Sequence, residues 1–306
     1  MDFFGPAPHL RPSLLAAGYA DAELRILRRR GSVETVRPGA YVATDDPRLG
    51  DAESRHVLMV LAAVAGLSAD AVVSHVSAAA VHGLPVWSVP FQRVHVTRSR
   101  RSGGRIGRFV HVHAARLDAD DVVELDGLRV TSMARTVVDL ARSEAFEAAV
   151  ATADGALRAG VSRADLQRAV ARSAHRRGNA AAARVMAFAD GRSESVGESR
   201  SRVVMARLGL PVPDLQVSVP SIGGGIDARS DFGWLERGVV GEFDGMAKYG
   251  RLLRPGESAG DAVVREKLRE DAIRDTGVRV VRWRWSELDD FGAPADRLTR
   301  AFTPAA

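Results

Sequence analysis

Four acidic residues in the last third of the chain have the types and spacing that metal-dependent cleavage of phosphodiesters requires. Asp231 lies late in one strand-like run, and Glu242 and Asp244 lie two residues apart in the next run, on one face of that strand. A hairpin between the two runs would bring Asp231 beside Glu242, while Glu198 is offered from a preceding helix. Because Mg²⁺ and Mn²⁺ prefer oxygen ligands, we expect Asp231, Glu242 and Asp244 to bind one of these ions. The alternative is a set of surface carboxylates.

Two lysines accompany these carboxylates. Of the 43 Lys and Arg residues, only Lys248 and Lys267 are lysines, and both lie in this region of the sequence. A lysine ammonium is a compact charge that can support an attacking water beside a phosphate. We expect one of these two lysines to do so, with Glu198 completing the catalytic set. The alternative for Lys267 is an ordinary helical ion pair with Asp271, four residues further on.

Helix and strand patterns from Ser193 onward give these residues their positions. The hydrophobic periodicity predicts one helix, three strands, a second helix and a closing strand. Their ranges are 193–209 for the first helix, 214–219, 226–234 and 239–243 for the strands, about 258–276 for the second helix and 278–285 for the last strand.

Residues 10–45 show a second pattern with a possible function, a helix, a turn, another helix and a short hairpin closed at Pro38-Gly39. We expect Asp21 to cap the second helix, with Leu24 and Leu27 facing inward. Such a helix can enter the major groove of DNA while arginines contact phosphates or guanine edges. The alternative is a solvated basic helix in a module for protein contact. The candidate DNA-binding residues are Arg25, Arg28, Arg29 and Arg30 on the helix and Arg37 in the hairpin.

Residues 46–190 alternate between helical and strand-like segments and predict an α/β domain. Its histidines include His75, His82, His95, His111 and His113. Since no acidic residue has a recognisable ligand spacing with them, we expect ordinary core or surface histidines rather than a metal site. A polar break ends this region. We therefore expect three domains, 1–45, 46–190 and 191–306, in a multidomain α/β (α+β) protein.

Composition narrows the class of protein. The chain has 306 residues, 46% of them hydrophobic and 26% charged, which is typical of a globular protein. The absence of cysteine excludes disulfide scaffolds, thiolate catalysis and cysteine-bound metals. The formal net charge of +5 is compatible with a polyanionic partner. No run approaches the roughly 18 apolar residues of a membrane span, so we expect a cytoplasmic protein without a membrane partner.

Several separated motifs resemble a known domain. The motifs are ESRSR at 198–202, LPVPDLQ at 210–216, RSDFGW at 229–234, GEFDGMAKYG at 241–250 and REKLREDAIRDTGVRVVRWRW at 265–285. Together they are similar to the very-short-patch-repair-endonuclease-like domain of actinobacterial proteins, within the PD-(D/E)XK superfamily. The resemblance implies a restriction-endonuclease-like fold, with Asp231 and Glu242 as its two acidic motif residues. Asp244 stands where these enzymes have a lysine. No histidine follows His175, which excludes the histidine-dependent nicking of the repair endonucleases.

Residues 10–190 carry a second resemblance. The two helices and the hairpin of residues 10–45 form a winged-helix pattern, and two motifs follow it, SHVSAAAVHGLPVW at 74–87 and VTSMARTVVDLA at 130–141. Together they are similar to the AbiEi-type antitoxins and transcriptional regulators of type IV toxin–antitoxin systems. That resemblance implies DNA as a partner and a nucleotidyltransferase-like toxin as a second partner. Two functions follow as hypotheses. One is a Mg²⁺-dependent DNA endonuclease or nickase, and the alternative is an AbiEi-like regulator with a silent nuclease fold.

Overall fold

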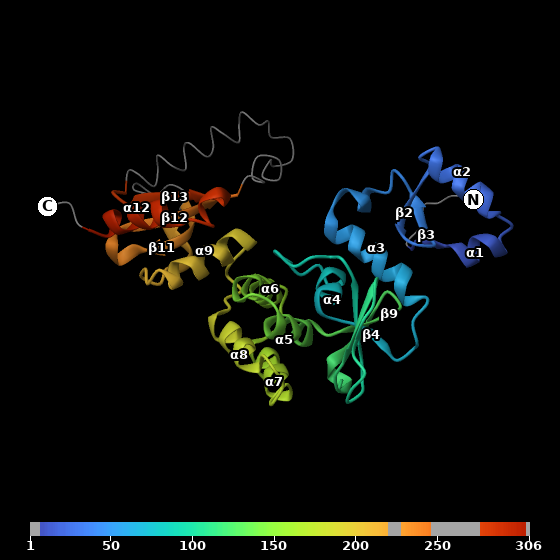
Figure 1. The fold of residues 1–306 in the computed structure, drawn as a ribbon. Coiled ribbons are helices and arrows are strands. Elements are labelled where there is room, and N and C mark those ends of the chain that lie inside the picture. Colours follow the sequence, from blue (N-terminus) through green and yellow to red (C-terminus); the bar gives the residue numbers. More distant parts are fainter. Residues whose placement is uncertain (1–6, 220–227, 246–275, 304–306) are drawn as a thin grey trace. The chain divides into compact units, whose positions relative to one another are not determined.

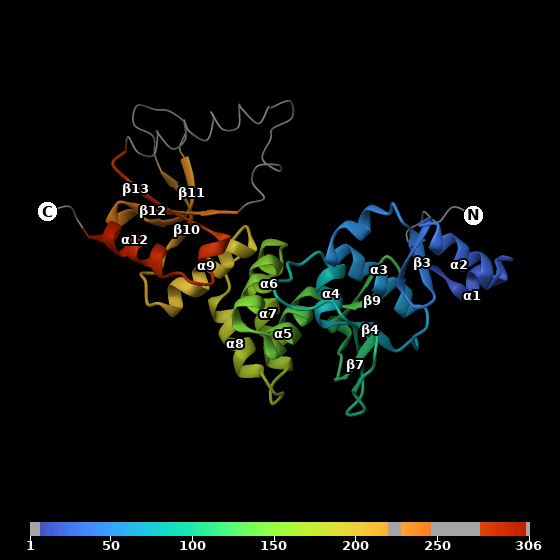
Figure 2. The ribbon, with the colours of Figure 1, turned by 45° about the horizontal axis from the view of Figure 1, so that its top comes forward.

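The computed structural model describes residues 7–219, 228–245 and 276–303 (Figures 1 and 2). The chain divides into two compact units. Unit 1 contains Met1–Thr152 and Gly160–Ala187, and unit 2 contains Ala153–Ala159 and Phe188–Ala306. Helices and three sheets make up the described residues, so the protein is mixed α/β, as the sequence predicts.

Unit 1 begins with a three-stranded antiparallel sheet and two helices. The elements are β1 (His9–Leu10), α1 (Arg11–Ala16), α2 (Asp21–Arg29), β2 (Val33–Arg37) and β3 (Ala40–Ala43), with sheet order β1-β3-β2. Leu24 of α2 is buried and Leu27 is packed against the same small core, as expected. The expected cap is wrong. Ala20 occupies the N-cap position, while Asp21 is the first helical residue and forms an exposed ion pair with Arg11 at 2.6 Å.

The centre of unit 1 is a six-stranded mixed sheet with order β6-β7-β5-β4-β9-β8. Helices α3 and α4 contribute Val60, Ala63 and Ala78 to its core. The elements are η1 (Pro47–Gly50), α3 (Ala52–Val64), β4 (Ala71–Val73), α4 (His75–Val81), β5 (Val94–Arg98), β6 (Arg105–Ile106), β7 (Val110–Ala114), η2 (Ala119–Asp121), β8 (Val122–Leu125) and β9 (Leu128–Thr131).

Four helices follow this sheet. They are α5 (Met133–Ser143), α6 (Phe146–Arg158), α7 (Arg163–Arg172) and α8 (Asn179–Phe188). Ser132 and Ser162 cap α5 and α7, since each hydroxyl accepts a hydrogen bond from a backbone N–H of the first turn. Helix α6 passes from unit 1 into unit 2 at Ala153.

Unit 2 is built on a four-stranded sheet with order β10-β11-β12-β13, in which the first two pairings are antiparallel and the last is parallel. The elements are α9 (Val196–Arg207), β10 (Asp214–Val219), β11 (Ala228–Trp234), η3 (Leu235–Arg237), β12 (Val239–Asp244), β13 (Arg279–Arg284), η4 (Trp285–Glu287) and α12 (Gly292–Phe302). They match the expected helix and strands closely. The helix expected over about 258–276 lies almost wholly outside the described residues.

The core of unit 2 holds α9 against the sheet. Phe232 and Trp283 are fully buried on the face that also contacts Met205 of α9 and Leu298 of α12. Gly197 allows a close approach, because a Cβ atom there would lie 1.9 Å from the ring of Phe243. The first turn of α9 is therefore fixed against the strand that carries the acidic motif.

Within the three described ranges, no helix combines the length and the apolar character that a bilayer crossing requires.

Candidate functional site

Glu198 is buried at the start of α9, where it closes the end of the helix. The Ser195 hydroxyl accepts from the Glu198 backbone N–H at 3.1 Å and donates to Glu198 Oε1 at 2.8 Å. Oε2 accepts from the Glu194 backbone N–H and from Gln216 Nε2, each at 2.8 Å. Burial, and then the charge of Asp231, raise the pKa of Glu198. Glu198 thus serves as a capping residue whose proton affinity depends on a second acidic side chain.

Asp231 lies at the point where β11 and β12 separate. The backbone pairing of β11 with β12 runs from Trp234 opposite Val239 to Phe232 opposite Gly241, and it ends there. Beyond it, Asp231 Oδ2 accepts from the backbone N–H of Phe243 at 2.9 Å, so a side chain takes the place of a backbone acceptor. This contact fixes the Asp231 carboxylate beside the residue that follows Glu242.

Glu242 and Asp244 face arginines of β13. In the parallel pairing of β12 with β13, Glu242 lies opposite Arg282 and Asp244 opposite Arg284. Arg282 Nε donates to Glu242 Oε2 at 2.8 Å, and the Glu242 side chain is only 7% exposed. Arg284 Nε lies 3.9 Å from Asp244 Oδ2. The arginines of the neighbouring strand thus balance the negative charges of Glu242 and Asp244.

The sequence did not lead us to expect these arginines, although the alternation R-W-R at 282–284 marks two basic residues on one face of a strand. Among the described residues, the expected ligands Asp231, Glu242 and Asp244 do not belong to any group of three or more metal-binding side chains within 4.8 Å of one another. The proposed bases Lys248 and Lys267 lie outside the described residues. The magnesium site therefore stays a prediction.

The basic helix α2 presents its arginines to solvent. Arg25, Arg28 and Arg29 line a shallow groove between α2 and residues 33–35 of β2, and Arg30 is exposed at the end of the helix. Arg37 differs from them. Its guanidinium lies 6.0 Å from the centre of the Phe109 ring, and the residue is partly buried. Arg25, Arg28 and Arg29 thus form one accessible cationic face of α2, and Arg30 is exposed at its C-cap.

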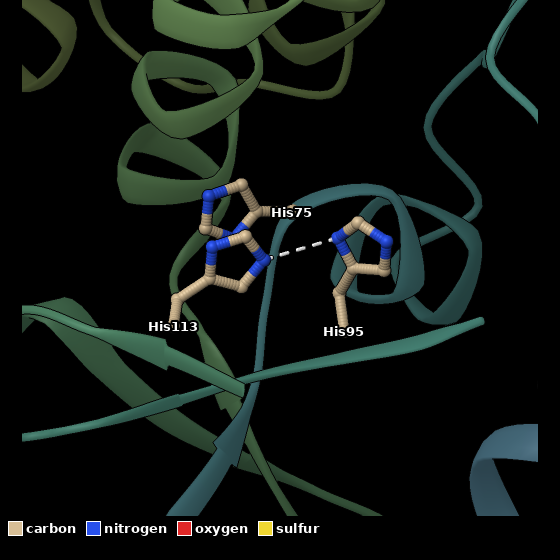
Figure 3. Close-up of side chains that lie close together, drawn as sticks. All are labelled: His75, His95 and His113. Atoms are coloured by element: carbon tan, nitrogen blue, oxygen red, sulfur yellow. Dashed lines mark hydrogen bonds between the residues drawn. The ribbon is translucent and has the colours of Figure 1, made fainter. Parts of the chain in front are cut away.

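Three histidines of the middle region come together. His75, His95 and His113, from α4, β5 and β7, form a group of neighbouring ring nitrogens that could hold a metal ion, and His113 and His95 are hydrogen-bonded (Figure 3). His82 is separate and its Nε2 lies 2.7 Å from the backbone oxygen of Thr131. No spacing rule in the sequence signals the group, because it forms only when the sheet is assembled.

Fold and sites define a two-unit mixed α/β protein with an acidic strand, a basic helix and a histidine cluster. Over 263 residues the chain is 31% identical to the uncharacterized protein MT2308 of Mycobacterium tuberculosis strain CDC 1551 / Oshkosh, covering 85% of this chain and 88% of that protein. The uncharacterized protein Rv2248 of strain ATCC 25618 / H37Rv matches with the same values. The chain belongs to the family of these mycobacterial proteins.

No model of a known protein family matches the chain. Among solved structures, the RV2827C protein from Mycobacterium tuberculosis aligns with a TM-score of 0.38 and 17% identity, covering 70% of this chain and 83% of that chain. This degree of likeness carries no argument about function.

Proposed function

We propose that the protein binds DNA through α2 and that unit 2 is a PD-(D/E)XK-type nuclease domain acting on DNA phosphodiester bonds. The observation that carries the proposal is the hydrogen bond from the Phe243 backbone N–H to Asp231 Oδ2 at 2.9 Å. It ties the acidic residue of β11 to the acidic segment of β12. The helix, the three antiparallel strands and the parallel fourth strand supply the framework in which such carboxylates work together.

The donor chemistry fits Mg²⁺ or Mn²⁺, because Asp231, Glu242 and Asp244 offer only carboxylate oxygens. Such an ion polarises a phosphoryl oxygen and lowers the pKa of a bound water. For Glu242 to serve as a ligand, its ion pair with Arg282 must open or be shared. Arg282 then stands beside the site as a cation able to contact a phosphate. Glu198 joins the first turn of α9 to β10, because its Oε2 accepts a hydrogen bond from Gln216 Nε2.

DNA binding is assigned to the N-terminal elements of unit 1, which we propose form a winged helix. Helices α1 and α2 are followed by the hairpin β2–β3. Helix α2 exposes Arg25, Arg28 and Arg29 along one side, and Arg30 is exposed at its C-cap. Exposed arginines on a short helix beside a hairpin suit a major groove bounded by phosphates. In this proposal, α2 and the hairpin bring the protein to DNA, and unit 2 cleaves it.

The test is cleavage of supercoiled plasmid, mismatched and branched DNA by the full-length protein with Mg²⁺ or Mn²⁺. We expect nicking by the wild type and none by Asp231→Asn, which removes a charge while keeping the side-chain shape. Asp214→Asn is the matched control, because Asp214 is an exposed residue of β10 paired with Arg192. Equal cleavage by wild type and Asp231→Asn would refute the assignment of Asp231.

A second candidate function rests on the Glu242–Arg282 ion pair, which neutralises the acidic motif from within the fold. We propose as the alternative an AbiEi-like regulator or antitoxin with a catalytically silent unit 2 and a nucleotidyltransferase-like toxin as partner. Retained DNA binding, with neither cleavage nor calorimetric Mn²⁺ binding at millimolar concentration, would favour this alternative.

A further inference from the structure

Three histidines that are distant in the sequence converge in unit 1 (Figure 3). His75 begins α4, His95 lies in β5 and His113 lies in β7. Each offers a ring nitrogen, and the three nitrogens all lie within 4.8 Å of one another. His113 Nε2 is 3.1 Å from His95 Nδ1, and the rings of His75 and His113 stack with centroids 3.7 Å apart. Ring nitrogens from three separate elements therefore lie close together in unit 1.

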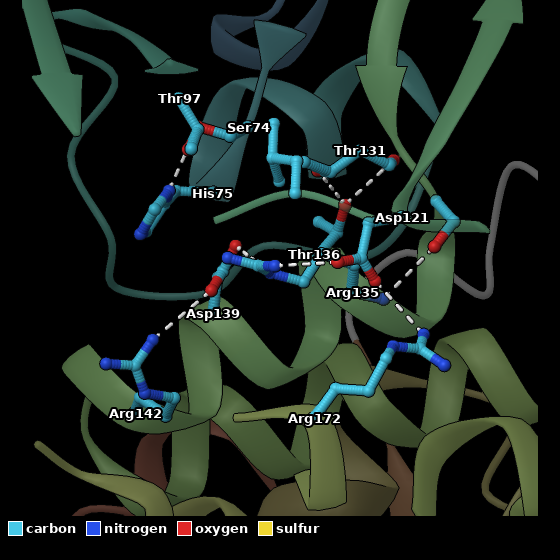
Figure 4. A network of polar contacts seen from close by, with 12 residues as sticks. Ser74, His75, Thr97, Asp121, Thr131, Arg135, Thr136, Asp139, Arg142 and Arg172 are labelled. Carbon is cyan, nitrogen blue, oxygen red and sulfur yellow. Dashed lines mark hydrogen bonds and ion pairs between the residues drawn. The ribbon is translucent and has the colours of Figure 1, made fainter. Parts of the chain in front are cut away.

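The backbone and the helix cap at His75 are arranged around its ring. His75 has a φ of 52°, in the left-handed region that residues with a side chain rarely adopt. Ser74 is the N-cap of α4 but makes no side-chain cap hydrogen bond. Its Oγ accepts from Thr97 at 2.8 Å and lies 3.0 Å from His75 Nδ1 (Figure 4). The Ser74 hydroxyl thus contacts the His75 ring instead of capping α4, which leaves the helix less stable than a capped one. Such local strain is associated with functional sites.

Burial favours the neutral form of the three rings. Burial, and next the neighbouring histidines, lower the pKa of His95 to about 4 and that of His113 to about 2. The same causes lower the pKa of His75 well below its usual value. A neutral imidazole is the form that donates a lone pair to a metal ion.

The nearest acidic residue in this network is already engaged. Asp139, which raises the proton affinity of His113, accepts from Arg135 Nε at 2.9 Å and from Arg142 at 3.4 Å (Figure 4). Arg135 also donates to Asp121 at 3.0 Å. Because this carboxylate is held by two arginines, the ligands available at the cluster are imidazole nitrogens.

The geometry points to a Zn²⁺ site formed by His75, His95 and His113, with the fourth position left to water. A set of imidazoles suits zinc and its neighbours in the transition series, whereas Mg²⁺ requires oxygen ligands. Zinc–nitrogen bonds of about 2.0–2.1 Å place tetrahedral ligand atoms about 3.4 Å apart. The His95–His113 separation of 3.1 Å is close to that value. With Nδ1 of His75 beside Ser74, its Nε2 is the ligand atom.

This site is separate from the carboxylates of unit 2 and uses a different class of ion. The wild-type full-length protein, without a histidine tag and stripped with a chelator, is titrated with Zn²⁺ against a chromophoric competitor, and then with Co²⁺. We expect one equivalent of Zn²⁺ bound at micromolar concentration or tighter, and the visible absorption bands of tetrahedral Co²⁺. Asp231→Asn should leave both results unchanged, which separates this inference from the proposed nuclease.

His95→Asn and His113→Asn should each weaken Zn²⁺ binding at least a hundredfold. His82→Asn is the control, because His82 lies at the end of α4 outside the group of three, with its Nε2 2.7 Å from the backbone oxygen of Thr131. Zinc binding that survives His113→Asn, or that is lost equally in His82→Asn, would overturn the assignment. Should the ligand variants not fold, zinc X-ray absorption on the wild type decides the question, since fewer than three imidazole ligands contradict it.

Discussion

At the scale of single residues, Glu198 and Asp231 are coupled through their charges. Glu198 is buried among hydrogen-bond donors, and the nearby Asp231 carboxylate disfavours a second negative charge. Asp231→Asn removes that charge and should lower the pKa of Glu198, which burial still raises. Carboxyl NMR titration of wild type and variant measures the change. An unchanged or higher pKa of Glu198 would show that the two side chains do not interact.

His56 makes unit 1 sensitive to acid. It is fully buried with Nε2 2.7 Å from Ser77 Oγ, and burial lowers its pKa to about 4. Between about pH 6.5 and pH 4, His56 is protonated in the unfolded chain but neutral in the folded chain. The free energy of unfolding therefore decreases as the pH falls through this range. One such group contributes a slope of at most about 1.4 kcal/mol per pH unit.

Replacing His56 by Gln should therefore make the loss of stability between pH 6.5 and pH 4 less steep. Urea unfolding at a series of pH values, in the presence of a chelator, measures the slope, and the exposed His175→Gln serves as control. A slope identical to that of the wild type would mean that His56 takes up its proton equally in both states.

At the scale of elements, Gly197 lets α9 pack closely against β12. A Cβ at Gly197 would lie 1.9 Å from Cε1 of the Phe243 ring, in a core that cannot expand freely. Gly197→Ala should destabilise unit 2 by about 1–3 kcal/mol, and adding Phe243→Leu should recover part of the loss. Gly292→Ala is the control, because its Cβ would meet only the Asp290 carboxylate at 3.3 Å. Equal denaturation midpoints for the two alanine variants would contradict this packing argument.

Helix α2 gives a prediction about salt. If Arg25, Arg28 and Arg29 contact phosphates, replacing all three by Ala should weaken DNA binding and reduce the dependence of log K on log salt by about one unit per lost contact. Fluorescence anisotropy at several salt concentrations measures both quantities. The control is the Ala triple variant of Arg100, Arg101 and Arg105, which removes the same charge from another exposed segment. Equal effects of the two triple variants would indicate general electrostatics rather than a helix interface.

Local patterns explain what the sequence predicts well at this scale. Strand β10 covers 214–219 as expected, and α9 and β12 lie within a few residues of their expected ranges. The alternation of polar and apolar residues in a strand and the capping of a helix depend on residues close in the sequence, so the sequence alone predicts them. The ion pair of Glu242 with Arg282 and the convergence of His95 with His113 depend on parallel strand pairing between distant segments. No local rule predicts such pairings, and so the sequence indicated the acidic motif but neither its arginine partner nor the histidine group.

At the scale of the whole molecule, the end of α6 belongs to unit 2. Asp154 is fully buried and accepts from Arg202 at 2.8 Å, from the Ser199 hydroxyl at 2.7 Å and from the Asp190 backbone N–H at 2.7 Å. A Cβ at Gly191 would lie 2.8 Å from the Leu157 side chain. The break we expected near Gly191 is therefore packed against a helix that precedes it.

A fragment beginning at Ser193 lacks Asp154 and leaves Arg202 without its carboxylate. We expect a fragment beginning at Phe146 to be more stable by about 3 kcal/mol or more, the usual loss when one partner of a buried ion pair is removed. Urea midpoints of the two fragments measure the difference. If the midpoints coincide, Asp154 does not contribute to unit 2 and the expected boundary at 191 is sufficient.

The parallel pairing of β12 with β13 also sets the order of events on the ribosome. Val239 and Val240 of β12 are fully buried, yet β12 gains its second neighbour only when synthesis has passed Arg284. Until then β12 has an open edge, which is the kind of surface that draws nascent chains into aggregation. Unit 1 can mature during translation, whereas unit 2 depends on a late closing strand and is the part of the chain most in need of a chaperone.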